Sequence, residues 1–188
     1  MKVLAALLAV LAMGCAAAAL WYWEPWSSDG DAPAELAEQA EDPEGDYTGS
    51  ACRRLAGVAA KLAEDDPPAG PYLRDLGRAA AGIRSGSRGI GDLARGGRNT
   101  LPGRGFLARF DDGTDGQARH FAGIATATAI GGATATRAIS IFVRDDPAGS
   151  ADGRLTDAAI AFANGLLAGE LEPRVAPRWI LDNLCRRR

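Results

Sequence analysis

The longest apolar stretch of the chain lies near its N-terminus. After Lys2, the 21 residues from Val3 to Trp23 carry no charged side chain. As a helix at about 1.5 Å per residue, this stretch is about 32 Å long, which is enough to cross the hydrocarbon layer of a bilayer. It ends in Trp21 to Trp23, and such aromatic rings favour the boundary between water and lipid. We therefore expect residues 1–23 to form a transmembrane signal-anchor.

The same stretch also fits two kinds of signal peptide. Val3 to Met13 has the length of a signal-peptide apolar region, and Ala12 to Cys15 resembles the bacterial lipoprotein box, in which the cysteine is lipidated. The box is imperfect, because alanine stands at position 12 where leucine is usual. An anchor, lipidation at Cys15 and ordinary cleavage all stay open. Each places the rest of the chain on the extracytoplasmic side of an inner membrane, either periplasmic or extracellular.

Residues 24–50 are acidic and contain three prolines. They carry nine Asp or Glu and no Lys or Arg. A segment of this composition buries too little apolar surface to fold, so we expect a flexible linker with a reach of about 30 Å. From Ala51 onward the balance reverses, since 20 of the chain's 21 basic residues but only 15 of its 24 acidic residues remain. The net charge of −3 thus hides an acidic tether joined to a basic body.

Residues 51–188 have the length of one globular domain. Their apolar residues recur at three- and four-residue spacing, which is typical of helices, and no run predicts a convincing sheet. The expected fold class is mostly α, a compact bundle of five or six helices with a Gly/Arg-rich loop. The expected elements are helices at Ser50 to Glu64, Tyr72 to Ile83, Thr156 to Gly169 and Pro177 to Leu184, and a long loop with few fixed contacts at Arg84 to Gly105. A further helix is expected to start at Asp115, and its uncharged run extends from Phe121 to Thr136.

Local signals mark several helix ends. Thr114 and Gln117 match a capping box, which predicts a helix from Asp115, and Thr156 matches a second N-cap. The first of these helices, uncharged after Phe121, is expected to be the central, buried one.

Two glycines interrupt the end of that central helix. Gly131 and Gly132 each cost about 1 kcal/mol against alanine in a helix, so we expect either a break or a close helix contact there. Ile139 to Val143 then either continues the helix or forms one short strand.

Composition excludes several function classes. A chain of 188 residues is too short for a large multidomain enzyme, and 47% hydrophobic residues argue against a wholly disordered protein. One histidine and three scattered cysteines do not assemble the familiar zinc clusters or two-histidine metal sites. A calcium loop starting at Asp111 is incomplete, because its twelfth position is Ala122 rather than a bidentate glutamate. We expect no metal and no cofactor.

The body holds only two cysteines, Cys52 in the first expected helix and Cys185 in the last. In an oxidising compartment a disulfide between them would join the two ends of the domain. The alternative is a pair of buried thiols, because the sequence does not fix their separation in space.

His120 is the only histidine, so a general acid–base enzyme would have to use it. Arg119 adjoins it, and Asp115 is an upstream carboxylate for orienting the ring. These three residues are the candidate catalytic set of an extracytoplasmic hydrolase or secreted effector. The competing interpretation is a histidine that is hydrogen-bonded in or beside the core.

Arginines concentrate in the Gly/Arg-rich segment. They predict binding to an anionic envelope component or a protein partner, with nucleic acid an unlikely ligand outside the cytoplasm. A solvated loop is the alternative. The candidate binding residues are Arg84, Arg88, Arg95, Arg98 and Arg104. Together with the N-terminal stretch, they make a membrane-tethered helical binding module the leading hypothesis, while the sequence leaves the oligomeric state open.

Overall fold

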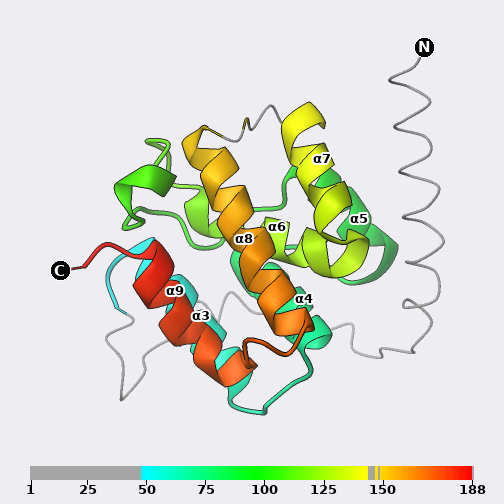
Figure 1. Ribbon diagram of the computed structural model, residues 1–188, viewed down its shortest axis with the longest axis horizontal. Coiled ribbons are helices and arrows are strands. Elements are labelled where there is room, and N and C mark those ends of the chain that lie inside the picture. The colour runs from blue at the N-terminus through cyan, green and yellow to red at the C-terminus, as the bar shows by residue number, and fades with distance from the viewer. Residues whose placement is uncertain (1–47, 144–146, 148, 188) are drawn as a thin grey trace.

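The computed structural model describes residues 48–143, 147 and 149–187 (Figure 1). The expected signal-anchor or lipidated leader at residues 1–23, including Cys15, and almost all of the acidic linker lie outside the described residues. Within the described ranges, no helix is both long enough and apolar enough to cross a membrane.

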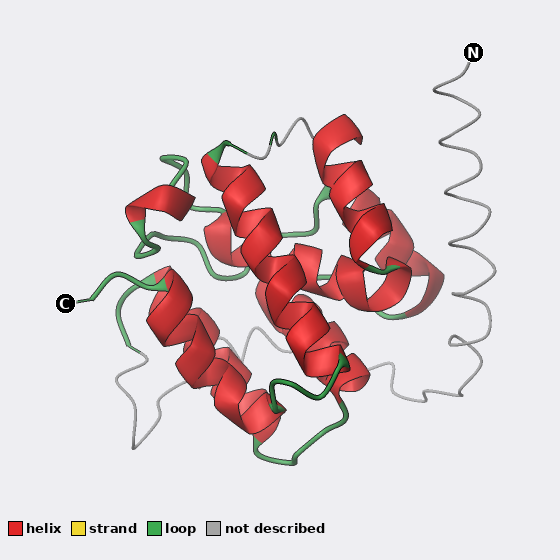
Figure 2. Ribbon diagram, in the orientation of Figure 1, coloured by secondary structure: helices red, strands yellow, loops and turns green. Residues whose placement is uncertain are grey.

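The described chain is helical, as expected (Figure 2). It contains seven α-helices and two short 3-10 helices, and in these ranges the β-structure is limited to a single bridge between Phe106 and Cys185. The α-helices are α3 (Ala51–Ala63), α4 (Ala69–Ala81), α5 (Gly86–Arg95), α6 (Gln117–Gly131), α7 (Ala133–Val143), α8 (Ala151–Leu167) and α9 (Ala176–Leu184), and the 3-10 helices are η1 (Ala108–Phe110) and η2 (Pro173–Val175). The described helices therefore exceed the five or six expected.

Helix α6 is central, as the sequence predicted. It packs against α4 on one side and α8 on the other, and Phe121, Ala122 and Ala125 are fully buried there. Its approach to α4 is close at Gly77, where an added Cβ would overlap the Thr126 hydroxyl. That hydroxyl donates to the Leu73 carbonyl at 2.9 Å. Glycine at position 77 thus lets a polar side chain of α6 bond the backbone of α4.

Helices α3 and α9 form a second layer of the bundle. They run side by side in opposite directions, so the start of α3 lies beside the end of α9 (Figure 1). The Trp179 ring of α9 packs at a tilt against the Phe162 ring of α8, with centroids 5.1 Å apart. The Phe162 ring in turn packs against Phe121 of α6, with centroids 5.2 Å apart. This aromatic cluster joins the α3/α9 pair to the central helix.

The expected loop from Arg84 to Gly105 is the main error of the sequence-based interpretation. Residues 86–95 form helix α5, and the chain after it is fixed to the end of α4. The Arg98 amide donates to the Ala81 carbonyl at 2.7 Å, and the Thr100 hydroxyl donates to the Ala79 carbonyl at 2.6 Å. These bonds satisfy carbonyls that the last turn of a helix leaves without partners.

Neither predicted capping residue caps a helix. Helix α6 begins at Gln117 rather than Asp115, and the Gln117 amide side chain bonds Asp112 instead of reaching back to Thr114. Helix α8 begins earlier than expected, at Ala151, because Ser150 accepts from the Gly153 amide and acts as its N-cap. Thr156 is consequently a fully buried residue inside the helix.

The glycine pair does break the central helix. Gly132 has φ +79°, a left-handed backbone value that glycine adopts without steric cost, and α7 starts at the next residue. Residues 139–143 therefore belong to a separate helix and form neither a strand nor a continuation of α6.

Candidate functional site

The two body cysteines form a disulfide. Cys52, in the first turn of α3, is bonded to Cys185, which directly follows α9, with their Cα atoms 5.5 Å apart. Both residues are buried. The predicted bridge is confirmed, and it closes the open end of the α3/α9 pair.

A loop segment lies between the joined ends. The Ala51 amide donates to the Arg104 carbonyl at 2.9 Å, and the Arg186 amide donates to the Gly105 carbonyl at 2.8 Å. On the other side of Phe106, the Leu107 amide donates to the Leu184 carbonyl at 2.7 Å. Gly105 has φ +113°, and a Cβ there would overlap Ser50. Backbone hydrogen bonds therefore fix residues 104–107 against both ends of the domain.

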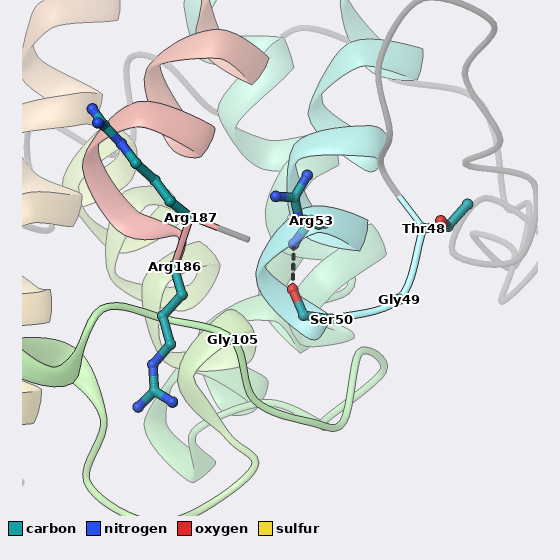
Figure 3. A pocket seen from close by; sticks show the side chains of 7 residues that line it. All are labelled: Thr48, Gly49, Ser50, Arg53, Gly105, Arg186 and Arg187. Atoms are coloured by element: carbon teal, nitrogen blue, oxygen red, sulfur yellow. Dashed lines mark hydrogen bonds between the residues drawn. The ribbon is translucent and has the colours of Figure 1, made fainter.

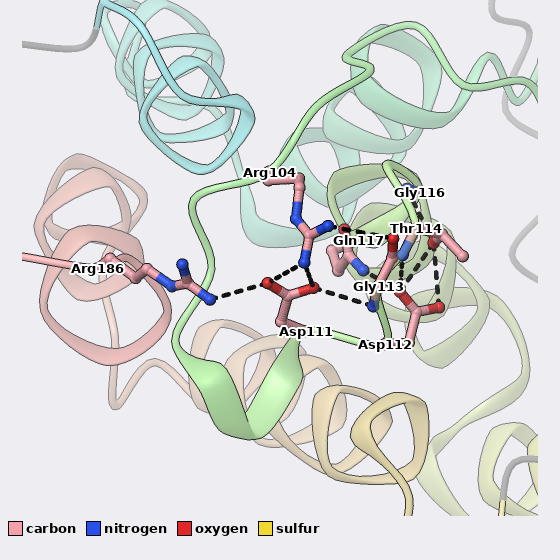
Figure 4. A network of polar contacts seen from close by, with 8 residues as sticks. All are labelled: Arg104, Asp111, Asp112, Gly113, Thr114, Gly116, Gln117 and Arg186. Atoms are coloured by element: carbon pink, nitrogen blue, oxygen red, sulfur yellow. Dashed lines mark hydrogen bonds and ion pairs between the residues drawn. The ribbon is translucent and has the colours of Figure 1, made fainter.

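Asp111 holds two arginines at this end (Figure 4). Both of its oxygens accept from Arg104 at 2.8 Å, and Oδ2 also accepts from Arg186 at 2.9 Å. The Asp111 side chain is only 7% exposed. Hydrogen bonds from the Arg104 guanidinium and the Gly113 amide hold the pKa of this carboxyl below its usual range. The Asp111 carboxylate thus fixes the C-terminal tail to the loop.

A hollow of about 290 Å³ opens beside the disulfide (Figure 3). Its walls come from the start of α3, the loop and the C-terminal tail, and three of its seven lining residues are arginines. It is lined by Thr48, Gly49, Ser50, Arg53, Gly105, Arg186 and Arg187. The Ser50 hydroxyl accepts from the Arg53 amide at 3.3 Å and so caps α3 at the edge of the hollow. A surface of this kind attracts anions.

Charge is divided between the two ends of the α3/α9 pair. The disulfide end, which we call the basic end, gathers the arginines at positions 53, 54, 104, 186 and 187 around the single buried carboxylate Asp111. The opposite end carries five acids and three basic residues, namely Glu64, Asp65, Asp66, Glu170, Glu172, Lys61, Arg174 and Arg178. The separation follows from the antiparallel pairing, because the start of α3 and the tail after α9 lie together.

The structure separates the predicted binding arginines. Arg104 lies at the basic end, whereas Arg84, Arg88 and Arg95 lie in or just before α5, on the other side of the molecule (Figure 1). Arg98 follows α5 and packs its side chain near Gly82.

Two arginines of the α5 region are engaged within the domain. Arg84 bonds both oxygens of Asp92, at 2.9 and 2.8 Å, and these bonds depress the pKa of that carboxyl. Arg95 donates to the Gly91 carbonyl at 3.2 Å. The α5 region is therefore a folded element with internal ion pairing rather than a solvated loop.

His120 lies in a polar cluster between three helices. Its Nε2 is 2.8 Å from the Thr156 hydroxyl, which is 3.2 Å from the Ser140 hydroxyl. Its Nδ1 is 4.0 Å from the Asp152 carboxylate. The imidazole is 8% exposed, while Thr156 and Ser140 are fully buried. This cluster joins α6, α7 and α8.

The other two residues of the candidate catalytic set face different neighbours. Arg119 donates to the Gly96 carbonyl at 3.4 Å, behind α5. The Asp115 carbonyl accepts from the Asn99 side chain at 3.0 Å. The carboxylate that comes within 4.0 Å of the His120 ring is instead Asp152, one helical turn before Thr156 on α8. With the start of α8 placed at Ala151, the four-residue spacing of Asp152 and Thr156 would have predicted that their side chains lie on the same face of that helix.

Among the residues that the structure describes, no group of three or more His, Cys, Asp or Glu is arranged to hold a metal ion. Asp112, within the incomplete calcium loop, turns toward Thr114 and Gln117 (Figure 4).

Comparison with known proteins finds no similarity, since no family model, no curated protein and no solved structure matches this chain.

Proposed function

We propose that this chain is a membrane-tethered, extracytoplasmic binding module, and that the basic end of its helical domain binds an anionic component of the cell envelope. The observation that carries the proposal is the hollow lined by Arg53, Arg186 and Arg187. The whole chain has a net charge of −3, so attraction of an anion depends on a local concentration of arginine rather than on the overall charge.

The N-terminal sequence supports the tether. An apolar stretch of 21 residues that ends in aromatic side chains suits a membrane anchor, and the disulfide suits an oxidising compartment. A tether at residues 1–23 keeps the domain near the membrane and so raises its local concentration at envelope ligands. The described domain begins at the basic end, which places that end nearest the tether along the chain.

Retention on immobilised inorganic polyphosphate tests the binding role. The full chain in zwitterionic detergent is eluted with rising NaCl and compared with the variant Arg53→Gln/Arg187→Gln. An arginine at an anionic surface is worth about 1 kcal/mol, so losing two should weaken binding roughly thirtyfold and lower the eluting salt concentration.

The matched control removes the same two charges from elsewhere on the domain. Arg174→Gln/Arg178→Gln alters two exposed arginines at η2 and the start of α9, away from the hollow. It should elute with the wild type. Elution of both double variants at the same salt concentration would refute a binding role for the basic end.

The arginines of the α5 region remain candidates for a second contact. Arg88 and Arg98 are exposed, whereas Arg84 is already paired with Asp92. Replacing Arg84, Arg88, Arg95 and Arg98 with alanine should weaken polyphosphate retention in a salt-dependent way if this region contributes. Unchanged retention would assign binding to the basic end alone.

Acid–base catalysis by His120 is the second candidate function. It is favoured by one observation, the order of Asp152, His120 and Thr156 as carboxylate, imidazole and hydroxyl, which is the order of a nucleophilic triad. The full burial of Thr156 opposes it, because a nucleophile must reach a substrate.

Chemical modification decides between the two roles of His120. The chain has one histidine, so the absorbance change on acylation by diethyl pyrocarbonate reports that ring alone. A histidine in the core should react far more slowly in the folded protein than in urea. Equal rates would favour the catalytic role.

A further inference from the structure

The acidic linker joins the domain at the edge of the basic hollow. Thr48, Gly49 and Ser50, the first described residues, form one wall of that hollow (Figure 3). The residues directly before them in the sequence are the last part of the acidic linker. The acidic linker and the basic hollow are therefore adjacent along the chain.

The two charge sets are complementary. Glu41, Asp42, Glu44 and Asp46 supply four carboxylates within a six-residue segment that contains no Lys or Arg. The hollow supplies the guanidinium groups of Arg53, Arg186 and Arg187. Arg186 also bonds Asp111, so the attraction for a further anion comes from the three arginines of the hollow together rather than from any one of them.

The distance along the chain permits contact. Asp46 lies two residues before Thr48, and Glu41 lies seven residues before it. An extended chain spans at most about 3.5 Å per residue, so all four carboxylates can reach a distance of no more than about 25 Å from the hollow. A ligand joined by so short a linker has an effective concentration in the millimolar range. Each exposed ion pair is weak by itself, so the attraction depends on several carboxylates acting together and is greatest at low salt.

We propose that residues 41–46 are an intramolecular ligand of the basic hollow and compete there with external anions. The proposal rests on the proposed function, since it concerns regulation of the same surface. Because exposed charges are screened over about 10 Å at 0.1 M salt, the competition is strong at low ionic strength and weak at high ionic strength. An external polyanion binds by displacing the acidic segment.

The test neutralises the acidic segment in the full chain. The near variant carries Glu41→Gln, Asp42→Asn, Glu44→Gln and Asp46→Asn. The far variant is the matched control, with four equivalent changes in the more distant part of the linker, at Asp29, Asp31, Glu35 and Glu38. Both remove four negative charges, so only position along the chain distinguishes them.

Two measurements are made on the three proteins in zwitterionic detergent. The first compares the backbone amide NMR signals of Arg53, Gly105 and Arg187 without any added ligand. The near variant should shift these signals relative to the wild type, and the far variant should leave them nearly unchanged. The second is elution from the polyphosphate resin, where the near variant should bind about fivefold more tightly than the other two at 50 mM NaCl and equally at 0.5 M.

The outcomes separate this proposal from the proposed function. If the near and far variants give the same amide signals and the same eluting salt, residues 41–46 do not occupy the hollow, whether or not the resin retains the protein. If the near variant shows both effects, the proposal is supported. The proposed function is tested separately: if Arg53→Gln/Arg187→Gln and Arg174→Gln/Arg178→Gln elute at the same salt concentration, the basic end is not the binding surface.

Discussion

The disulfide is the interaction whose removal should alter the domain most. Cys52 and Cys185 are separated by 133 positions, so the bond closes nearly the whole body into one loop. In the chain-entropy description, a loop of that length removes unfolded-state entropy worth about 5 kcal/mol at 25 °C. A domain of ordinary size has about 5–15 kcal/mol of stability, so the bond accounts for a large part of it.

Urea unfolding followed by circular dichroism at 222 nm measures this contribution. The comparison is between the oxidised wild type and Cys52→Ala/Cys185→Ala, because alanine keeps both buried positions apolar. The double variant should lose about 5 kcal/mol of unfolding free energy. Adding reductant should destabilise the wild type by a similar amount and leave the double variant unchanged.

Local protection should change along with global stability. The amide of Leu107 donates to Leu184, and that of Arg186 donates to Gly105, so both bonds join the loop to the tail beside the disulfide. These two amides should exchange hydrogen faster in the double variant than amides at the centre of α6. If oxidised and reduced wild type unfold within 1 kcal/mol of each other, the entropic argument is refuted for this domain.

Two further predictions concern packing and pH. Gly77→Ala should destabilise the domain by about 1–3 kcal/mol in urea unfolding, because the new Cβ overlaps Thr126. In the same assay Gly123→Ala should be neutral or stabilising by up to about 1 kcal/mol, because a Cβ has room at that position. Asp111 has a depressed pKa in the folded state, so its stabilising effect is present above the unfolded value near 4 and is lost as pH falls below it. Asp111→Asn should therefore flatten the fall in thermal midpoint between pH 5 and pH 2; an unchanged slope would contradict the assignment.

Helices with clear apolar periodicity were predictable from the sequence. Leu55, Val58 and Leu62 placed α3, and Leu155, Phe162 and Leu166 placed the buried face of α8. In these segments the spacing of large apolar residues is set by the same packing that stabilises the helix. The start of α8 was misplaced because Ser150 and Thr156 both resemble N-caps, and only the loop before the helix decides between them.

The sequence pattern did not predict helix α5, because contacts with the rest of the domain stabilise it while its own residues have low helix propensity. Its ten residues include three glycines, which disfavour a helix. One of them, Gly89, is required by packing, because a Cβ would overlap the Arg84 carbonyl. The Asp92 carboxylate bonds both the amide and the guanidinium of Arg84, and these bonds fix the residue just before the helix to its second turn. A single-sequence pattern does not contain that pairing.

The sequence predicts part of the basic end, namely the arginines beside the disulfide, but not the role of Asp111. Pairing Cys52 with Cys185 already implies that Arg53 and Arg186 are neighbours, since each adjoins a bridged cysteine. That consequence follows from covalent geometry alone, because bridged Cα atoms lie about 5.5 Å apart. The role of Asp111 does not follow, because its contact with Arg186 joins residues 75 positions apart through a loop with no repeating pattern. Covalent constraints thus locate the surface, whereas the folded loop determines which of its charges remain available to a ligand.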